Sequence, residues 1–165
     1  MSELRTNRIV PRDGLVSGAS GGVIQVVFFS LATGSTVTVN GTDLVDVLTA
    51  TITPTRSDSK ILVQVTSAPK TNGGSANFQF GAQIQRNSTT IMYDNEYLQM
   101  NNGYAPNAFT GAYTVLDSPA STSALTYKFR CSRSVSGREL YFENSTDNTG
   151  NYYNKHTMTL MEVSA

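Results

Sequence analysis

The side chains that could act as catalytic acids or bases are few and widely separated in this sequence. His156 is the single histidine, and no cysteine stands near it. A multi-histidine metal site or a Ser-His catalytic pair needs partners at defined spacings, and no such partners surround this residue. We therefore interpret His156 as a strand residue beside a turn, and we expect no metal site and no cofactor.

Two pairs of carboxylates have spacings that could support acid–base chemistry. Asp43 and Asp46 are separated by two residues, and Asp94 and Glu96 by one, which would place the second pair on one face of a strand. Paired carboxylates in a groove are the machinery of glycoside hydrolysis. Solvated charges in turns explain both pairs more simply. We predict that the protein is not an enzyme and has no catalytic residues.

Two loops combine tyrosine with amide side chains and offer binding rather than catalysis. They span residues 93–113 and 141–153. Such mixtures stack on sugar rings and bond their hydroxyls, but they also suit subunit contacts, because tyrosine is enriched at protein interfaces. We favour subunit contacts, which need no ligand. The candidate glycan-binding residues are Tyr97, Asn102, Tyr104, Phe109, Tyr152 and Tyr153.

The composition limits the partners of the chain. Twelve basic and twelve acidic residues cancel, so no net field attracts nucleic acid or anionic lipid. No run of about 18 apolar residues is present to span a membrane, and the N-terminus lacks the apolar segment of a secretion signal. Cys131 is the single cysteine, which excludes an internal disulfide and predicts a core position. We expect no nucleic acid and no membrane partner.

Short apolar or alternating runs predict nine to eleven strands from Val23 onward. Turn clusters separate them at intervals of roughly 8–12 residues, as in an antiparallel sandwich or barrel. Residues 41–50 could form a helix, but their valine and threonine content favours a strand or bulge. Alternation assigns one set of side chains to the core: Ile61, Val63, Val65, Leu125, Tyr127, Phe129 and Cys131.

The chain divides into an arm and a strand-rich module. Residues 1–20 are polar and broken by turn-forming residues, which is typical of an arm or linker, whereas residues 21–165 carry the strand pattern. The run from Val23 to Phe29 is apolar on both faces. A strand has this pattern when it is covered on two sides, or when another copy of the chain presses against it.

Four short motifs follow one another along the chain: GGVIQVV (21–27), ITPTRSDSKILVQV (52–65), LDSPASTSALTYKF (116–129) and TLMEVSA (159–165). In this order they resemble a module of tail-fibre-like and other virion structural proteins of tailed bacteriophages of marine and cyanobacterial type. The resemblance covers residues 21–165, and the N-terminal MSELRTNRIVPRDG is similar to the short arm that precedes this module.

The resemblance implies an all-β fold, an antiparallel two-sheet β-sandwich of jelly-roll type. It also implies a homotrimer that is made in the host cytoplasm and mounted on the phage particle, with capsid or tail proteins as partners. The expected trimer-interface residues are Val23, Val26 and Phe28. The expected virion-attachment residues of the arm are Leu4, Arg5, Arg8, Ile9, Val10 and Arg12.

The length of the arm indicates which kind of virion protein the resemblance favours. About 20 residues precede the module, and they span at most roughly 70 Å when fully extended. Long tail fibres carry extended stalks, so this arm favours a short appendage or a capsid decoration. The alternative is a receptor-binding fibre tip that binds host surface glycans through the tyrosine-rich loops.

Overall fold

The computed structural model describes residues 22–71, 80–94, 110–133, 139–146, 152–153 and 156–165, and this part of the chain contains strands and no helix. The predicted all-β class is therefore confirmed. The strands are β1 (Val23–Ser30), β2 (Thr36–Val39), β3 (Val45–Ile52), β4 (Lys60–Ser67), β5 (Lys70–Thr71), β6 (Phe80–Arg86), β7 (Thr89–Asp94), β8 (Gly111–Asp117), β9 (Leu125–Arg133), β10 (Leu140–Glu143), β11 (Ser145–Thr146), β12 (Tyr152–Tyr153) and β13 (Thr157–Val163).

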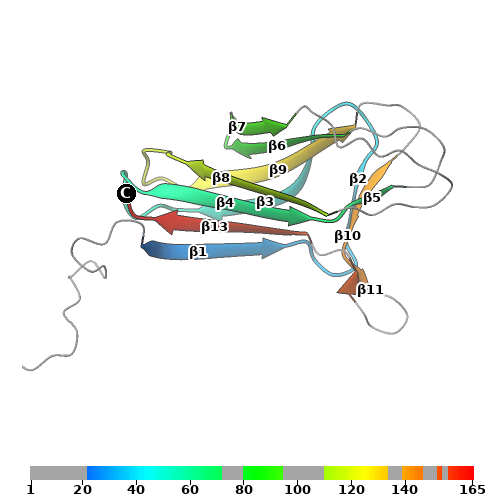
Figure 1. Ribbon diagram of the computed structural model, residues 1–165, viewed down its shortest axis with the longest axis horizontal. Helices are drawn as coiled ribbons and strands as arrows, with labels where there is room; N and C mark the ends of the chain where they lie inside the picture. The colour runs from blue at the N-terminus through cyan, green and yellow to red at the C-terminus, as the bar shows by residue number, and fades with distance from the viewer. Residues whose placement is uncertain (1–21, 72–79, 95–109, 134–138, 147–151, 154–155) are drawn as a thin grey trace, which may run out of the picture.

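Eight of these strands form two four-stranded sheets, with the orders β1-β13-β4-β8 and β3-β9-β6-β7. In the view of Figure 1, β6, β7 and β9 lie above β1, β4 and β13. Along the chain, the eight strands pair from the outside inward: β1 with β13, β3 with β9, β4 with β8, and β6 with β7, all antiparallel. A long hairpin folded over on itself gives this nested pairing, which is the jelly-roll connectivity.

The remaining strands lie at one end of the sandwich. β2, β10 and β5 form a three-stranded sheet, and β11 pairs with β12. Figure 1 shows β2, β5, β10 and β11 at the end opposite the start of β1 and the end of β13. The three two-residue strands among them, β5, β11 and β12, explain why the structure has more strands than the sequence predicted.

The core lies between the two large sheets, and the predicted alternation of β4 and β9 fills it. Ile61, Val63 and Val65 are at most 1% exposed. On the facing sheet, the inward residues of β9 are at most 5% exposed: Leu125, Tyr127, Phe129 and Cys131. These inward faces are as predicted, and burial raises the pKa of the Cys131 thiol well above its usual value.

The segment that could have been helical is a bulged strand. The pairing of β3 with β9 shifts between Asp46 and Leu48, so Val47 is the extra residue. A bulge places two consecutive residues against one partner and bends the strand. Val47 and Leu48 are accordingly both buried, at 4% and 1% exposure. The interpretation of this segment as a strand or bulge is therefore confirmed from Val45 onward, and β3 continues to Ile52.

Candidate functional site

His156 is fully buried immediately before β13, and both of its ring nitrogens have partners. Nδ1 lies 2.9 Å from Ser67 Oγ and 3.3 Å from the backbone nitrogen of Ala68. Because a backbone N–H can only donate, Nδ1 is an acceptor, and Nε2 carries the proton that it donates to the Glu143 carbonyl, 3.1 Å away. The neutral ring thus ties the end of β4 to the end of β10, and burial lowers its pKa.

The carboxylates considered for acid–base chemistry do not form a pair in the part of the chain that the structure describes. Asp43 is exposed in the segment before β3, and Glu96 lies outside the described residues. Asp46 accepts hydrogen bonds from Lys128 Nζ at 2.5 Å and from Arg130 Nε at 2.6 Å. Burial opposes ionisation of Asp46, but these two cations outweigh it and lower the pKa of its carboxyl. Asp46 is therefore a surface ion-pair residue.

Glu162 is a fully buried carboxylate that the sequence analysis missed. Its Oε2 accepts a hydrogen bond from Gln25 Nε2 at 2.6 Å. Its Oε1 accepts from the backbone nitrogen and Oγ1 of Thr55, at 2.8 and 2.9 Å, and from the Arg56 backbone nitrogen at 3.3 Å. Burial alone would raise the pKa of Glu162, but these donors outweigh it and hold the pKa below its usual value. The alternation of Met158, Leu160 and Glu162 along β13 was the signal for this inward position.

Two polar clusters draw most of their members from the four sequence motifs, and Arg86 is the member that lies outside them. Gln25 lies in the first motif, Thr55 in the second and Glu162 in the fourth. In the third motif, Asp117 accepts hydrogen bonds from the Arg86 guanidinium, at 2.6 and 2.8 Å, and from the Tyr127 hydroxyl at 2.7 Å. Burial and this carboxylate raise the pKa of Tyr127. These motif residues thus hold strands of the sandwich together.

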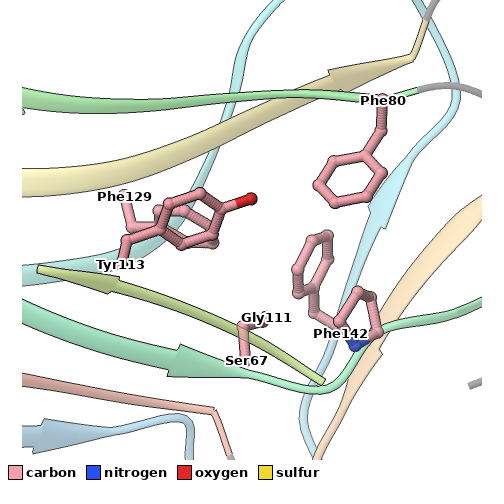
Figure 2. A pocket seen from close by; sticks show the side chains of 7 residues that line it. Ser67, Phe80, Gly111, Tyr113, Phe129 and Phe142 are labelled. Carbon is pink, nitrogen blue, oxygen red and sulfur yellow. The ribbon is translucent and has the colours of Figure 1, made fainter. Parts of the chain in front are cut away.

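A small apolar pocket lies between the sheets, and Figure 2 shows its seven lining residues, six of them labelled. The ring of Phe80 points toward that of Phe142, and Tyr113 lies beside Phe129 with ring centroids 5.4 Å apart. The pocket leaves no room for a water molecule. Burial raises the pKa of Tyr113 to about 12, so its hydroxyl stays protonated at neutral pH. The side chains that line the pocket therefore leave no space for a ligand between them.

One outward row of sheet β1-β13-β4-β8 is apolar across the whole sheet, while threonine and glutamine occupy many of the other outward positions. We call the outer side that carries this row the apolar face. Val26, Met161, Leu62 and Leu116 are paired in register across all four strands. Val26 and Leu116, at the two ends of this row, are 56% and 53% exposed. Phe28, in the next outward row of β1, is 64% exposed.

The outer side of sheet β3-β9-β6-β7 is polar. Besides the Asp46 ion pairs, Arg130 Nη1 lies 3.4 Å from both Gln83 Oε1 and Gln85 Oε1. The Thr51 and Thr126 hydroxyls are 3.0 Å apart across β3 and β9. These side chains satisfy one another or face water, so this outer surface carries a charged network, whereas the other carries an apolar row.

The structure places the predicted interface residues together. Val23, Val26 and Phe28 all point outward from β1 on the apolar face, in register with outward positions of β13. Leu62 and Leu116 belong to the same face but were missed. No local pattern could reveal them, because only the pairing of distant strands brings them into one row.

Most other predicted binding residues lie outside the described part of the chain. These are Leu4, Arg5, Arg8, Ile9, Val10, Arg12, Tyr97, Asn102, Tyr104 and Phe109. Tyr152 and Tyr153 form β12, whose backbone pairs with β11. Within the described residues, no helix is long and apolar enough to cross a bilayer, and no group of three or more His, Cys, Asp or Glu could hold a metal ion.

Comparison with known proteins does not identify a family for this chain. No family model matches the sequence, and no curated protein matches it. Among solved structures, the chain is similar to a chain in the structure of infectious bursal disease virus Gt strain, with a TM-score of 0.39 and 12% sequence identity. The match covers 98% of this chain and 43% of that chain, so this chain spans less than half of its length.

The buried imidazole predicts a loss of stability in mild acid. The pKa of His156 lies below its ordinary value of 6.5 in the folded chain, so the unfolded chain binds the proton more readily. Stability is then full above about pH 6.5 and falls by up to about 1.4 kcal/mol per pH unit below it, toward the folded pKa. Urea unfolding at pH 7.5, 6.5 and 5.5 measures this loss. His156→Gln should unfold more easily but show a flatter pH dependence, and an equally steep dependence in this variant would contradict the assignment.

The buried carboxylate predicts a second, more acidic transition. The folded pKa of Glu162 is lowered from 4.5, so its contribution is present above that pH and is lost as the pH falls through the folded value. Glu162→Gln puts an amide donor where a second acceptor is needed, and we expect a loss of about 1–3 kcal/mol in urea unfolding at pH 7. Asp58→Asn, which changes an exposed carboxylate of the adjacent turn, is the matched control and should change stability little. Equal effects of the two variants would refute this role.

Proposed function

We propose that this chain is a structural protein of a tailed-phage virion, a homotrimeric surface appendage that is anchored through residues 1–20. The appendage is a short fibre or a capsid decoration. The observation that carries the proposal is the apolar face of sheet β1-β13-β4-β8, which is open to solvent in the single chain. The four ordered motifs and the similar N-terminal arm support the phage assignment.

The apolar face indicates assembly because it is contiguous. Single exposed apolar residues are common on soluble proteins, but an apolar row across a whole sheet typically marks an interaction site. Among the described strands, β1 lies at an edge of its sheet, and its eight residues, VIQVVFFS, include no charge and no proline. Edge strands that avoid pairing with other chains usually carry a charged residue or a proline. Both features fit a chain that works next to other copies of itself.

The polar side chains support a structural role. His156, Asp46, Asp117 and Glu162 each have partners within the fold. These groups join strands and leave no acid beside a base in an open groove. The contribution of the described residues is therefore to fold stability and to binding of other chains, as expected of a structural virion component.

The arm fits the role of an anchor. Residues 1–20 include Arg5, Arg8 and Arg12 against Glu3 and Asp13, so docking on another virion protein combines ionic and apolar contacts. Each arm contributes a modest contact area. Three arms on one trimer bind as a unit, however, and such avidity exceeds single-site affinity by about 10²–10⁴-fold.

The trimer should dissociate when a charge is placed on its apolar face. Val26 is 56% exposed in the single chain, so Val26→Asp leaves the fold intact but buries an unpaired carboxylate in the trimer, at a cost of several kcal/mol. Light scattering should show about three times the chain mass of 17.8 kDa for the unaltered protein and a single chain for the variant. Thr51→Asp on the polar face is the control and should remain trimeric. An unaltered protein that is monomeric at micromolar concentration would count against the trimer.

Removing the arm should separate attachment from assembly. Deletion of residues 1–20 removes none of the described strands, so the shortened chain should stay trimeric and equally stable but no longer attach to phage particles. Labelled antibody in electron microscopy measures occupancy on particles. Replacing Arg5, Arg8 and Arg12 by Ala should weaken attachment and reduce its salt sensitivity. Full occupancy by the shortened chain would show that the arm is not the anchor, and absence of the unaltered protein from particles would refute the virion role.

A further inference from the structure

The apolar face extends well beyond the strand that the sequence marked as an interface. Leu116 lies on β8, at the opposite edge of the sheet from β1, and is 53% exposed. Leu62 and Met161 join it to Val26 in one row. A contact made by β1 alone would leave the β8 end of this row in water. The interface that buries this row must therefore cover all four strands.

We propose that three copies turn the whole outer side of sheet β1-β13-β4-β8 toward a common axis that runs along the strands. This inference rests on the proposed homotrimer and adds which surface it buries. The axis brings the Val26, Met161, Leu62 and Leu116 row of each copy to the same level, where the three rows form one apolar layer. In the next level, Phe28 lies in a row with Thr159, Gln64 and Thr114.

The dimensions of the sheet fit this arrangement. Strands are spaced about 4.8 Å apart, so a four-stranded sheet is roughly 19 Å wide. Three such sheets arranged as a triangle stand about 5.5 Å from the central axis. That distance is close to half of the roughly 10 Å that separates two sheets packed through their side chains. The outward side chains of three copies would therefore fill the space around the axis.

The strand directions fit as well. Each neighbouring pair in the order β1-β13-β4-β8 is antiparallel, so β1 and β8 run in opposite directions. At each corner of the triangle, β1 of one copy meets β8 of the next and can pair with it in the antiparallel sense. Among the described strands, none pairs with the outer edge of either one. Three corner pairings would cover the outer edges of β1 and β8 in all three copies.

The charge of the face favours another copy over the arm as the occupant. Lys60 is the one charged residue among the outward positions of the four described strands. The arm carries more arginine than acidic residues, and it would find no carboxylate on this face. A second copy instead places the same apolar row, Val26 to Leu116, against this one. One extended segment would also cover only about a quarter of the width of a four-stranded sheet.

A lysine at the β8 end of the row tests this proposal. Leu116→Lys should convert the trimer to a single chain in light scattering, a threefold loss of mass, while circular dichroism shows an unchanged fold. Tyr93→Lys is the matched control, because Tyr93 is 51% exposed on β7 in the other sheet, and it should remain trimeric. A Leu116→Lys trimer beside a Val26→Asp monomer would overturn this inference and leave the proposed function standing. Loss of the trimer in both lysine variants would also overturn it.

Thiol labelling provides a readout that does not depend on dissociation. Cys131 is the single cysteine and is fully buried, so an introduced surface cysteine is labelled selectively. In the intact trimer, Leu116→Cys should react with a maleimide at least tenfold more slowly than Tyr93→Cys. Equal rates would overturn the proposal. Absence of the protein from phage particles would refute the virion role, yet slow labelling of Leu116→Cys would still support the buried face.

Discussion

A buried carboxylate determines how the chain closes its sandwich. Glu162 lies inside β13 without contact with solvent, and an ionised group there is tolerated only when its oxygens receive hydrogen bonds. Gln25 from β1 and the backbone at Thr55 and Arg56 supply these bonds. The first strand, the turn after β3 and the last strand must therefore meet at one point. This arrangement also aligns β1 with β13 and thus sets the edge of the apolar face.

The side chains on the two outer surfaces of the sandwich differ in how they interact with water and with one another. On sheet β3-β9-β6-β7, Asp46, Lys128 and Arg130 satisfy one another in the single chain. On sheet β1-β13-β4-β8, the apolar row contains side chains that water solvates poorly, and among the described residues its two ends, Val26 and Leu116, are left largely exposed. The polar groups of the first surface are satisfied in the single chain, whereas burial of the second surface would lower the free energy. The two outer sides of the sandwich thus differ in what contact with another surface would do to them.

Local pattern predicted much of the fold. Period-2 alternation identified the inward residues of β4 and β9, because a strand points successive side chains to opposite faces. It missed β5, β11 and β12, since two paired residues carry no pattern. The alternation is also interrupted within β3, where the bulge at Val47 puts two consecutive residues inward while the pairing with β9 continues. For the apolar face, local pattern marked Val26 and Phe28 but neither Leu62 nor Leu116, which lie on the same side of the sheet.

The sequence by itself determined most of the strand content and the inward side chains of β4 and β9, because composition and short-range spacing decide both. It also showed that His156 has no second histidine and no cysteine near it in the chain. Only the tertiary structure decided that residues 26, 62, 116 and 161 share one row and that Glu162 receives its donors from two distant segments. The reason is physical. The register between strands far apart in the chain is set by the pairing and burial of whole strands, and a shift of one residue would turn each of these side chains to the other face.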